Sequence, residues 1–524
     1  MRTGPAKGEI LHQEYTMFNK SALSIMKSNI IVIFGGSGDL AKRKLMPALC
    51  LLHSGNKLDK DFIILGVGRT KLDNESYRRS IGDGLSKYLS VNEVCNVNKE
   101  NFLSRIHYLK MDPAKEQDYT LLKEAISALA GNVGKILYYL ATPPSLYEQI
   151  PANLLKSALN TPESRIIVEK PFGYNLQSAG KMNDILRSAF AEKQIFRIDH
   201  FLGKETVQNI LAFRFANGIF EPLWNRNYID RVEITAVENM GIEDRGGFYE
   251  GAGALRDMVQ NHLIQLLALV AMEPPVAFNE QEFRNEVVKV YRSLRPLTDE
   301  EISKNVVRGQ YIASHRKDGI KINGYREEKS VAADSYTETF LAMKVNISNW
   351  RWEGVPFYIR TGKQMPTKVS EIIIHFRPTP HKLFNSSEGC PEQNQLVIRI
   401  QPNEGAVLKF DMKVPGSGFE VKQVPMAFTY DKLGGLPSGD AYSKLIEDCM
   451  NGEPVLFTRS DAVEASWNYF DPILRYWQEN SDIPLYGYPA GTWGPPESDA
   501  IIEGGKCWTN PCKNLTDTDL YCEL

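Results

Sequence analysis

Two of the eight histidines stand beside residues that could make an imidazole accept a proton. His200 lies in the segment RIDHFLGKE, between Asp199 and an aromatic residue and shortly before Lys204. His262 lies in GALRDMVQNHLIQLLALV, on a predicted helical face with Leu255, Met258, Val259 and Leu266. A histidine on such an apolar face is more often a core residue with satisfied hydrogen bonds than a catalytic base.

A base needs a carboxylate that orients it, and two aspartates are candidates. Asp257 precedes His262 by five positions, which places it about 140° around an α-helix. We therefore expect Asp257 to face another group and Asp199 to pair with His262. Such a pair would hold the tautomer and stabilise the imidazolium as the proton is taken. The matching chemistry is hydride transfer from a carbinol carbon to a nicotinamide, while the base removes the hydroxyl proton.

A glycine-rich turn follows the first predicted strand and opens the first helix. It reads Gly35, Gly36, Ser37, Gly38, Asp39 and Leu40. Glycines let the backbone approach a pyrophosphate, which then lies at the positive end of the helix. Ser37 replaces the middle glycine of the usual fingerprint, and such a turn can also be only a strand–helix connection. Its place in a first βαβ unit favours nucleotide binding.

The end of the second predicted strand bears on which dinucleotide is bound. An NAD site usually has a carboxylate there for the ribose 2′-hydroxyl. This chain has Arg69, Thr70 and Lys71 after Gly68 instead. A guanidinium can bind a 2′-phosphate through two hydrogen bonds, which predicts NADP. A solvated surface arginine is the alternative, and arginine does not exclude NAD.

The surrounding elements predict two domains after an N-terminal tail of residues 1–28. Strands and helices alternate over 29–200, which predicts an α/β Rossmann-type dinucleotide-binding domain with a parallel sheet. Residues 201–524 predict an α+β domain with a large, mainly antiparallel sheet and helices against one face. Helices are expected over 204–215 and 253–270, and the tail after Trp493 is expected to wrap the surface.

Composition excludes several classes of protein. The formal net charge is −3, so there is no general attraction to nucleic acid or an anionic membrane, and a phosphate ligand needs a local basic cluster. The spacing of the last three of the seven cysteines matches no zinc-binding motif, and we expect reduced thiols. There is no secretory signal and no run of about 20 apolar residues. We expect a cytoplasmic protein without a metal ion.

Five motifs stand in the order found in glucose-6-phosphate dehydrogenases: GGSGDLAKRKLMPAL, IIVEKPFG, RIDHFLGKE, RDMVQNHL and VPFYIRTGK. The chain resembles that family from about Asn29 to at least Trp493. The resemblance implies oxidation of C1 of D-glucose 6-phosphate to 6-phospho-D-glucono-1,5-lactone with NADP, the first oxidative step of the pentose phosphate pathway.

The resemblance also implies roles for particular residues. His262 would be the base that takes the C1 hydroxyl proton, paired with Asp199. The residues that would bind substrate are Lys170, His200, Phe201, Lys204, Glu238, Asp257, Lys363 and Lys368. The residues that would bind the cofactor are Gly35, Ser37, Gly38, Asp39, Leu40, Arg69, Tyr147 and Lys170. Phe201 replaces a tyrosine common in the family, so one hydrogen bond to the phosphate would be missing.

Three further expectations follow from the family. Its members form homodimers or homotetramers through the large sheet. Some members have a second, structural NADP site, in which Arg399 fits one position, although the tail after Trp493 resembles members without that site. The rival interpretations are a related dehydrogenase for another sugar or sugar phosphate, and a catalytically inactive NADP-binding sensor.

Overall fold

This computed structural model describes residues 30–59, 61–89, 98–130, 135–315, 319, 321–381, 383–384, 393–430, 441–480 and 482–511. The predicted tail of residues 1–28 lies outside them. The chain forms two compact units. Unit 1 comprises Met1–Glu169, Ile185–Ile198 and Tyr442–Pro454, and unit 2 comprises Lys170–Asp184, Asp199–Ala441 and Val455–Leu524. Our predicted domains of 29–200 and 201–524 are continuous segments, whereas these units are not.

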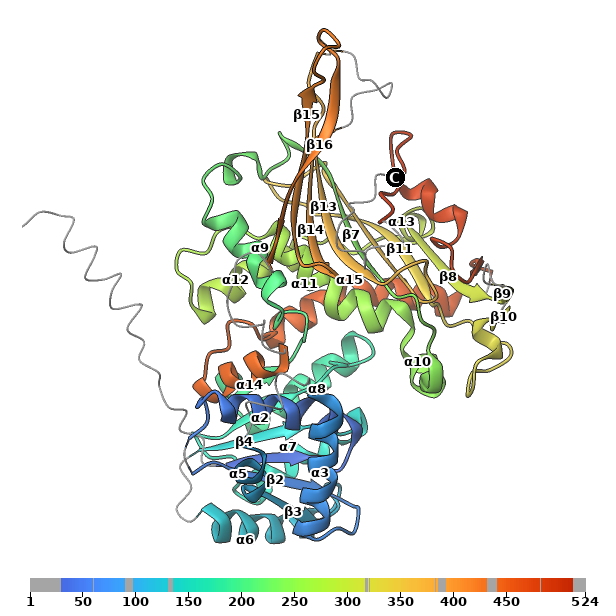
Figure 1. The fold of residues 1–524 in the computed structure, drawn as a ribbon. Helices are drawn as coiled ribbons and strands as arrows, with labels where there is room; N and C mark the ends of the chain where they lie inside the picture. The colour runs from blue at the N-terminus through green and yellow to red at the C-terminus, as the bar shows by residue number, and fades with distance from the viewer. Residues whose placement is uncertain are drawn as a thin grey trace, which may run out of the picture. The chain divides into compact units, whose positions relative to one another are not determined.

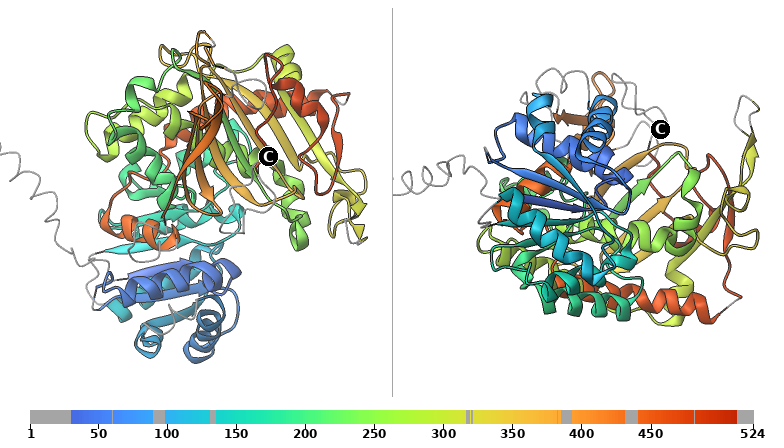
Figure 2. Two further views of the ribbon diagram at one scale, coloured as in Figure 1. Left: turned by 45° about the horizontal axis from the view of Figure 1, so that its top comes forward. Right: turned by 90° about the horizontal axis from the view of Figure 1, so that it is seen from below.

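Unit 1 contains a six-stranded parallel sheet in the order β3-β2-β1-β4-β5-β6. The strands are β1 (Ile30–Phe34), β2 (Ile63–Gly68), β3 (Ile106–Lys110), β4 (Ile136–Leu140), β5 (Arg165–Val168) and β6 (Ile195–Arg197). β1 and β4 are buried at every position, as a sheet covered on both faces requires. Figure 2 shows helices on both faces. This is the strand order of the Rossmann fold, as the sequence predicted.

The helices of unit 1 connect these strands. They are η1 (Ala41–Leu45, a π-helix), α2 (Met46–Ser54), α3 (Asn74–Tyr88), α5 (Lys99–Ser104), α6 (Tyr119–Ala130) and α7 (Gln149–Lys156). α14 (Ala441–Asn451) follows later in the chain, and α8 (Leu176–Ala189) is divided between the units, because Lys170–Asp184 belongs to unit 2 and Ile185–Ile198 to unit 1. α14 is tied to unit 1 because Ser443 Oγ donates to Ala48 O and the Arg165 guanidinium donates to Cys449 O at 2.8 Å.

Unit 2 contains a nine-stranded sheet in the order β16-β15-β14-β13-β7-β12-β11-β8-β17. The strands are β7 (Ile229–Val237), β8 (Val306–Ile312), β11 (Phe340–Asn346), β12 (Pro356–Gly362), β13 (Val369–Phe376), β14 (Gln395–Gln401), β15 (Gly405–Lys413), β16 (Val421–Thr429) and β17 (Tyr486–Pro489). The pairs β12–β7 and β17–β8 are parallel, and the other pairs are antiparallel. Figure 1 shows β15 and β16 extending from this sheet as a long hairpin.

The helices of unit 2 include α9 (Glu205–Phe215), α10 (Gly246–Ala254), η7 (Leu255–Leu263, a π-helix), α11 (Ile264–Ala271), α12 (Glu280–Arg292), α13 (Asp299–Asn305) and α15 (Ser460–Glu479). The single helix predicted over 253–270 is therefore wrong in detail. Gly253 has φ +68 and breaks the chain direction, and the first nine residues after Ala254 form a π-helix rather than an α-helix.

Neighbouring residues of β12 show what covers each face of the large sheet. Phe357 packs on Trp352, whose indole N–H donates to Ala271 O at the end of α11. Tyr358 points the other way and packs on Trp508 of the C-terminal segment. Helices therefore cover one face, as predicted, and residues after Trp493 cover part of the other.

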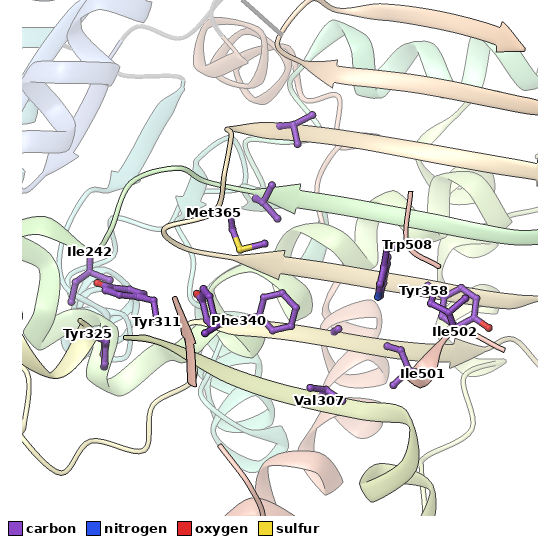
Figure 3. Packing of buried hydrophobic residues seen from close by; sticks show 14 of the residues in the cluster. Ile242, Val307, Tyr311, Tyr325, Phe340, Tyr358, Met365, Ile501, Ile502 and Trp508 are labelled. Carbon is purple, nitrogen blue, oxygen red and sulfur yellow. The ribbon is translucent and has the colours of Figure 1, made fainter. Parts of the chain in front are cut away.

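A buried cluster lies under this C-terminal segment. Figure 3 shows Tyr358, Ile501, Ile502 and Trp508 together at one end of the cluster. Phe340 and Met365 lie between them and a group of tyrosines at the other end (Figure 3). The segment after Trp493, which includes η10 (Pro496–Ile501), is thus part of the core of unit 2. Among the described residues, no helix has the length and apolar character needed to cross a membrane.

Candidate active site

The candidate base lies near the end of the π-helix η7. His262 is 1% exposed, and its Nδ1 lies 2.6 Å from Oδ1 of Asp199, which is 2% exposed. Asp199 follows β6, and its Oδ1 also accepts from the Phe201 backbone N–H at 2.9 Å. The contact that the sequence predicted between Asp199 and His262 is therefore present in unit 2.

This contact determines which ring nitrogen of His262 is basic. A buried carboxylate only accepts hydrogen bonds, so Nδ1 carries the proton and Nε2 has the lone pair. Burial lowers the pKa of His262 below its ordinary value, against the opposing effect of Asp199. Burial raises the pKa of Asp199, but the charge of His262 and the hydrogen bond to it lower the pKa below its ordinary value overall. The pair is an ionised carboxylate and a neutral imidazole that can accept a proton.

Lys170 lies at the basic nitrogen of His262 and joins it to Asp257. Lys170 Nζ is 2.8 Å from His262 Nε2 and donates to Asp257 Oδ1 at 3.0 Å. The sequence predicted that Asp257 faces another group and that Asp199 pairs with His262, and Lys170 is that other group. The segment is π-helical, however, and not α-helical as that prediction assumed. A π-helix has i→i+5 hydrogen bonds, which bring residues five apart onto the same side. Burial raises the pKa of Asp257, but Lys170 and Lys363 lower it well below the ordinary value, so this carboxyl is ionised.

A second cluster of cations and rings lies against His262. The His200 ring meets the His262 ring edge-on, with 4.8 Å between centroids, and burial holds the pKa of His200 well below its ordinary value. The Phe201 ring stacks on His262 at 4.6 Å. Lys204 Nζ lies 4.3 Å from the centroid of Phe201. The Phe201 ring thus contacts both the candidate base and the partly buried ammonium group of Lys204.

Lys204 has a partner that the sequence did not reveal. Its Nζ donates to Oε1 of Gln401, at the end of β14, at 2.8 Å. The two residues are 197 positions apart, and the packing of α9, which Lys204 precedes, against β14 brings them together. Burial lowers the pKa of Lys204 to about 8, and the nearby charge of Lys368 also lowers it, whereas Glu404 raises it.

The remaining predicted substrate residues belong to β7 and β12. Glu238 follows β7, Lys363 follows β12, and their side chains form an ion pair. β7 and β12 pair in parallel, so residues that follow the two strands lie at one edge of the sheet. Lys368 is exposed before β13 and close enough to Lys204 to affect its pKa. Unit 2 therefore brings all ten predicted catalytic and substrate residues into one connected region.

One group in this region has the residue types of a metal site. Asp199, His200 and His262 each offer a ligand atom, all within 4.8 Å of one another. His262 already uses Nδ1 for Asp199, and its Nε2 faces the Lys170 ammonium. The arrangement suits proton transfer better than cation binding, because the ammonium lies where a metal ion would need the imidazole lone pair.

The glycine-rich turn in unit 1 has little room for side chains. Gly35 has φ +82, and a Cβ there would lie 2.1 Å from Ala141 O. A Cβ on Gly36 would lie 2.7 Å from the Cα of Gly66 on β2. Gly35 N–H and Gly36 N–H both donate to Val67 O. The turn thus packs against β2 and the residue after β4, and the helix that follows it presents its N-terminal end, which suits a pyrophosphate.

The other predicted cofactor residues of unit 1 differ in their contacts and exposure. Ser37 Oγ lies 3.2 Å from Thr70 Oγ1, which joins the turn to the end of β2. Arg69 is exposed and forms no ion pair with any residue that the structure describes. Asp39 is exposed and pairs with Arg43, while Leu40 is partly exposed and Tyr147 is buried. Arg69 and Thr70 thus lie beside the turn at the end of β2.

Comparisons with known proteins agree with this geometry. Residues 32–209 match the family model described as glucose-6-phosphate dehydrogenase, NAD binding domain. Residues 211–509 match glucose-6-phosphate dehydrogenase, C-terminal domain. Glucose-6-phosphate 1-dehydrogenase of Aggregatibacter actinomycetemcomitans is 49% identical over 488 residues, which cover 92% of this chain and 97% of that protein. The enzyme of the same name from Treponema pallidum is 47% identical over 507 residues, covering 95% and 98%.

Solved structures give the same result. One described as glucose-6-phosphate dehydrogenase in complex with its substrate glucose-6-phosphate has a TM-score of 0.84 and 35% identity, covering 93% of this chain and 99% of that chain. The glucose-6-phosphate 1-dehydrogenase of Mycobacterium avium has a TM-score of 0.80 and 36% identity over the same shares. A parallel dinucleotide-binding sheet, a buried carboxylate–histidine pair and full-length similarity lead to one conclusion. The chain belongs to the glucose-6-phosphate dehydrogenase family.

Proposed function

We propose that this chain oxidises C1 of D-glucose 6-phosphate to 6-phospho-D-glucono-1,5-lactone, with NADP as the hydride acceptor. The observation that carries the proposal is the pair of Asp199 and His262 next to a cluster of cations in unit 2. His262 Nε2 accepts the C1 hydroxyl proton while the C1 hydride leaves. The bound nicotinamide supplies the carbon that accepts this hydride.

Asp199 prepares His262 for this step and stabilises its product. The hydrogen bond at 2.6 Å keeps the proton on Nδ1, so that Nε2 faces the substrate. When Nε2 takes the proton, the imidazolium lies against an ionised carboxylate in a buried site, where the attraction is strong. Lys170, which donates to Nε2 in this structure, also has Asp257 as an acceptor at 3.0 Å. It can therefore turn from the imidazole when a sugar hydroxyl binds.

The phosphate is bound by His200 and Lys204. An ammonium in a buried setting binds a phosphate dianion more strongly than a solvated one. Gln401 holds Lys204 without neutralising it, because an amide oxygen accepts a hydrogen bond but carries no charge. The carboxylates of Glu238 and Asp257 accept hydrogen bonds from sugar hydroxyls, with Lys363 and Lys368 at the same site. This combination favours a phosphorylated sugar over either a free sugar or a bare phosphate.

NADP is proposed over NAD on the basis of Arg69. The end of β2 has a hydroxyl and exposed cations where an NAD site usually has a carboxylate. Gly35, Ser37, Gly38, Asp39 and Leu40 bind the pyrophosphate, with Tyr147 and Lys170 also assigned to the cofactor. The proposal also includes a homodimer or homotetramer. Met412, Phe419, Met426 and Phe428 of β15, β16 and their connection are 40–74% exposed, which supports association through this part of the sheet.

The reaction can be followed by absorbance at 340 nm with each of two sugars and two cofactors. We expect the highest kcat/KM with glucose 6-phosphate and NADP. Equal kcat/KM for glucose and glucose 6-phosphate would show that the phosphate is not recognised. No turnover with any pair, despite dinucleotide binding, would favour the inactive sensor. A preference for NAD would overturn the role of Arg69.

The base assignment is tested by His262→Asn. We expect kcat to fall by roughly 10²–10⁴-fold, because an amide cannot accept the proton at neutral pH. The Kd for glucose 6-phosphate should change little, since the phosphate and hydroxyl contacts are retained. Calorimetric titration gives this Kd independently of turnover. A near-normal kcat in this variant would show that another group is the base.

A further inference from the structure

The start of the π-helix η7 is held by a residue outside the predicted site. The backbone N–H of Leu255, the first residue of η7, donates to Oε1 of Glu338 at 3.0 Å. The preceding N–H, of Ala254, donates to the backbone O of Glu338 at 2.9 Å. The first N–H groups of a helix have no partner within the helix. One residue thus satisfies two successive N–H groups where the catalytic helix begins.

The Glu338 carboxylate packs directly against Gly253. This glycine has φ +68, and a Cβ there would lie 2.4 Å from Oε1 of Glu338 and 2.7 Å from Oε2. The Glu338 carboxylate therefore occupies the space that any larger residue at position 253 would need. Glu338 itself is 5% exposed. The position of Leu255 in turn sets the positions of Asp257 and His262 along η7.

The next residue, Thr339, holds the other half of the substrate region. Its backbone O accepts from the Lys363 N–H at 3.0 Å, directly after β12. Its Oγ1 lies 3.0 Å from the hydroxyl of Tyr488, which donates to Lys363 O at 2.7 Å. The chain then enters β11 through Phe340, which is buried in the cluster of Figure 3. Lys363 is therefore positioned by the same short turn that positions η7.

We propose that Glu338 and Thr339 form a positioning clamp that sets the catalytic helix and the Lys363 strand end at the correct separation for the sugar. Neither residue touches the reacting groups in this structure. Glu338 acts through Leu255 on Asp257 and His262, and Thr339 acts through the backbone of Lys363. The proposal deepens the proposed function and rests on it. A shift of about 1 Å in a reacting group can cost roughly 10²-fold in rate.

Two conservative variants of Glu338 separate the effect of side-chain length from the effect of charge. Glu338→Gln keeps a side-chain oxygen at the same distance, so the Leu255 N–H keeps its acceptor. Glu338→Asp keeps the charge but draws the oxygen back by one methylene. We expect kcat/KM for glucose 6-phosphate to be close to wild type in Glu338→Gln and about 10²-fold lower in Glu338→Asp. KM for the dinucleotide should be unchanged in both, because its binding residues belong mainly to unit 1.

The opposite order of kcat/KM in these two variants would overturn the proposal. If Glu338→Asp were near wild type and Glu338→Gln inactive, the carboxylate would act through its charge. Glu371→Asp is the matched control, since Glu371 is 2% exposed on β13 and pairs with Arg399 rather than with η7. It should lower stability to urea without changing kcat/KM. The same loss of kcat/KM in this control would reduce Glu338 to a general structural role.

A double-mutant cycle with Gly253→Ala tests the direct contact. The added Cβ meets the Glu338 carboxylate, so this variant alone should show the loss in kcat/KM expected of Glu338→Asp. In a Glu338→Ala background the clash is absent, and the same substitution should cost less. Strictly multiplicative losses would contradict the contact. The wild-type rate with glucose 6-phosphate tests the proposed function separately, and calorimetric Kd values for the sugar phosphate in each variant do not depend on turnover.

Discussion

The chemistry of the site depends on what surrounds each side chain. His262 would be an ordinary buried histidine without Asp199, because Asp199 is the acceptor that the structure shows for the Nδ1 proton. Asp257 and Asp199 are both ionised carboxylates beside the same imidazole, yet one orients the ring and the other binds Lys170. Asp199 contacts Nδ1 of the ring directly, whereas Asp257 is joined to Nε2 through Lys170, and this decides which carboxylate orients the imidazole.

Lys204 leads to a prediction about pH. Burial lowers its pKa to about 8, so the ammonium is present below that pH and is lost as pH rises through it. We expect kcat/KM for glucose 6-phosphate to fall above pH 8, because the free enzyme then lacks a cation for the phosphate. Lys204→Arg should remove this decrease, since a guanidinium stays charged. A full pH profile of both proteins checks the prediction, and an unchanged decrease in the arginine variant would assign it to another group.

At the scale of elements, both functional turns depend on glycines with positive φ. Gly35 lets the turn after β1 pass close to β4, and Gly253 lets the chain enter η7 beside Glu338. The π-helix then brings residues five apart to one side, which an α-helix would not do. Local geometry of this kind determines where Asp257 and His262 point, although both lie in a segment whose helical pattern is plain in the sequence.

Gly35→Ala tests the turn in unit 1. The new Cβ would lie 2.1 Å from Ala141 O at φ +82, so the turn must move. We expect a loss of more than about 1 kcal/mol in unfolding free energy and a clear rise in the Kd for the dinucleotide. Gly180→Ala in α8 is the control, because a Cβ there meets nothing within 4 Å. That variant should be neutral or more stable by up to about 1 kcal/mol. Wild-type dinucleotide affinity in Gly35→Ala would refute the assigned role.

At the scale of the whole molecule, each unit has its own set of functional residues. Unit 1 contains the glycine-rich turn and Arg69, and unit 2 contains the base, its carboxylate and the cation cluster. The C-terminal segment belongs to the core of unit 2 rather than to its periphery. Arg360 of β12 has the ring of Trp493 at 4.9 Å and that of Trp508 at 4.6 Å, and its guanidinium donates to Asn510.

Removal of one tryptophan should show how much this segment contributes to stability. Trp508 is 5% exposed, packs on Tyr358 and donates to Ser498 O. We expect Trp508→Ala to lower the free energy of unfolding by roughly 3–5 kcal/mol. Trp350→Ala removes a side chain that is 92% exposed and should change it by less than about 0.5 kcal/mol. Urea unfolding measures both, and equal stability of the two variants would mean that the segment does not support the core.

The sequence alone determined the fold class, the position of the nucleotide turn and the pairing of Asp199 with His262. These follow from local patterns: apolar strands between helices, a glycine turn after the first strand, and a histidine that needs a partner from another segment. Ordered motifs then identified the family. Within the predicted large sheet, β7 and β14 form where the sequence is rich in apolar residues.

Only the tertiary structure decided the rest. The segment that contains Asp257 and His262 is π-helical, and hydrophobic spacing does not distinguish a π-helix from an α-helix over nine residues. Gln401 and Glu338 reach the site from positions distant in the sequence, through strand pairing and chain turns. The placement of Tyr442–Pro454 in unit 1 depends on packing against residues almost 400 positions earlier. One of these is Ala48, whose backbone O accepts from Ser443 Oγ across a separation of 395 positions. Contacts of this range depend on the whole fold, so no local pattern of residues records them.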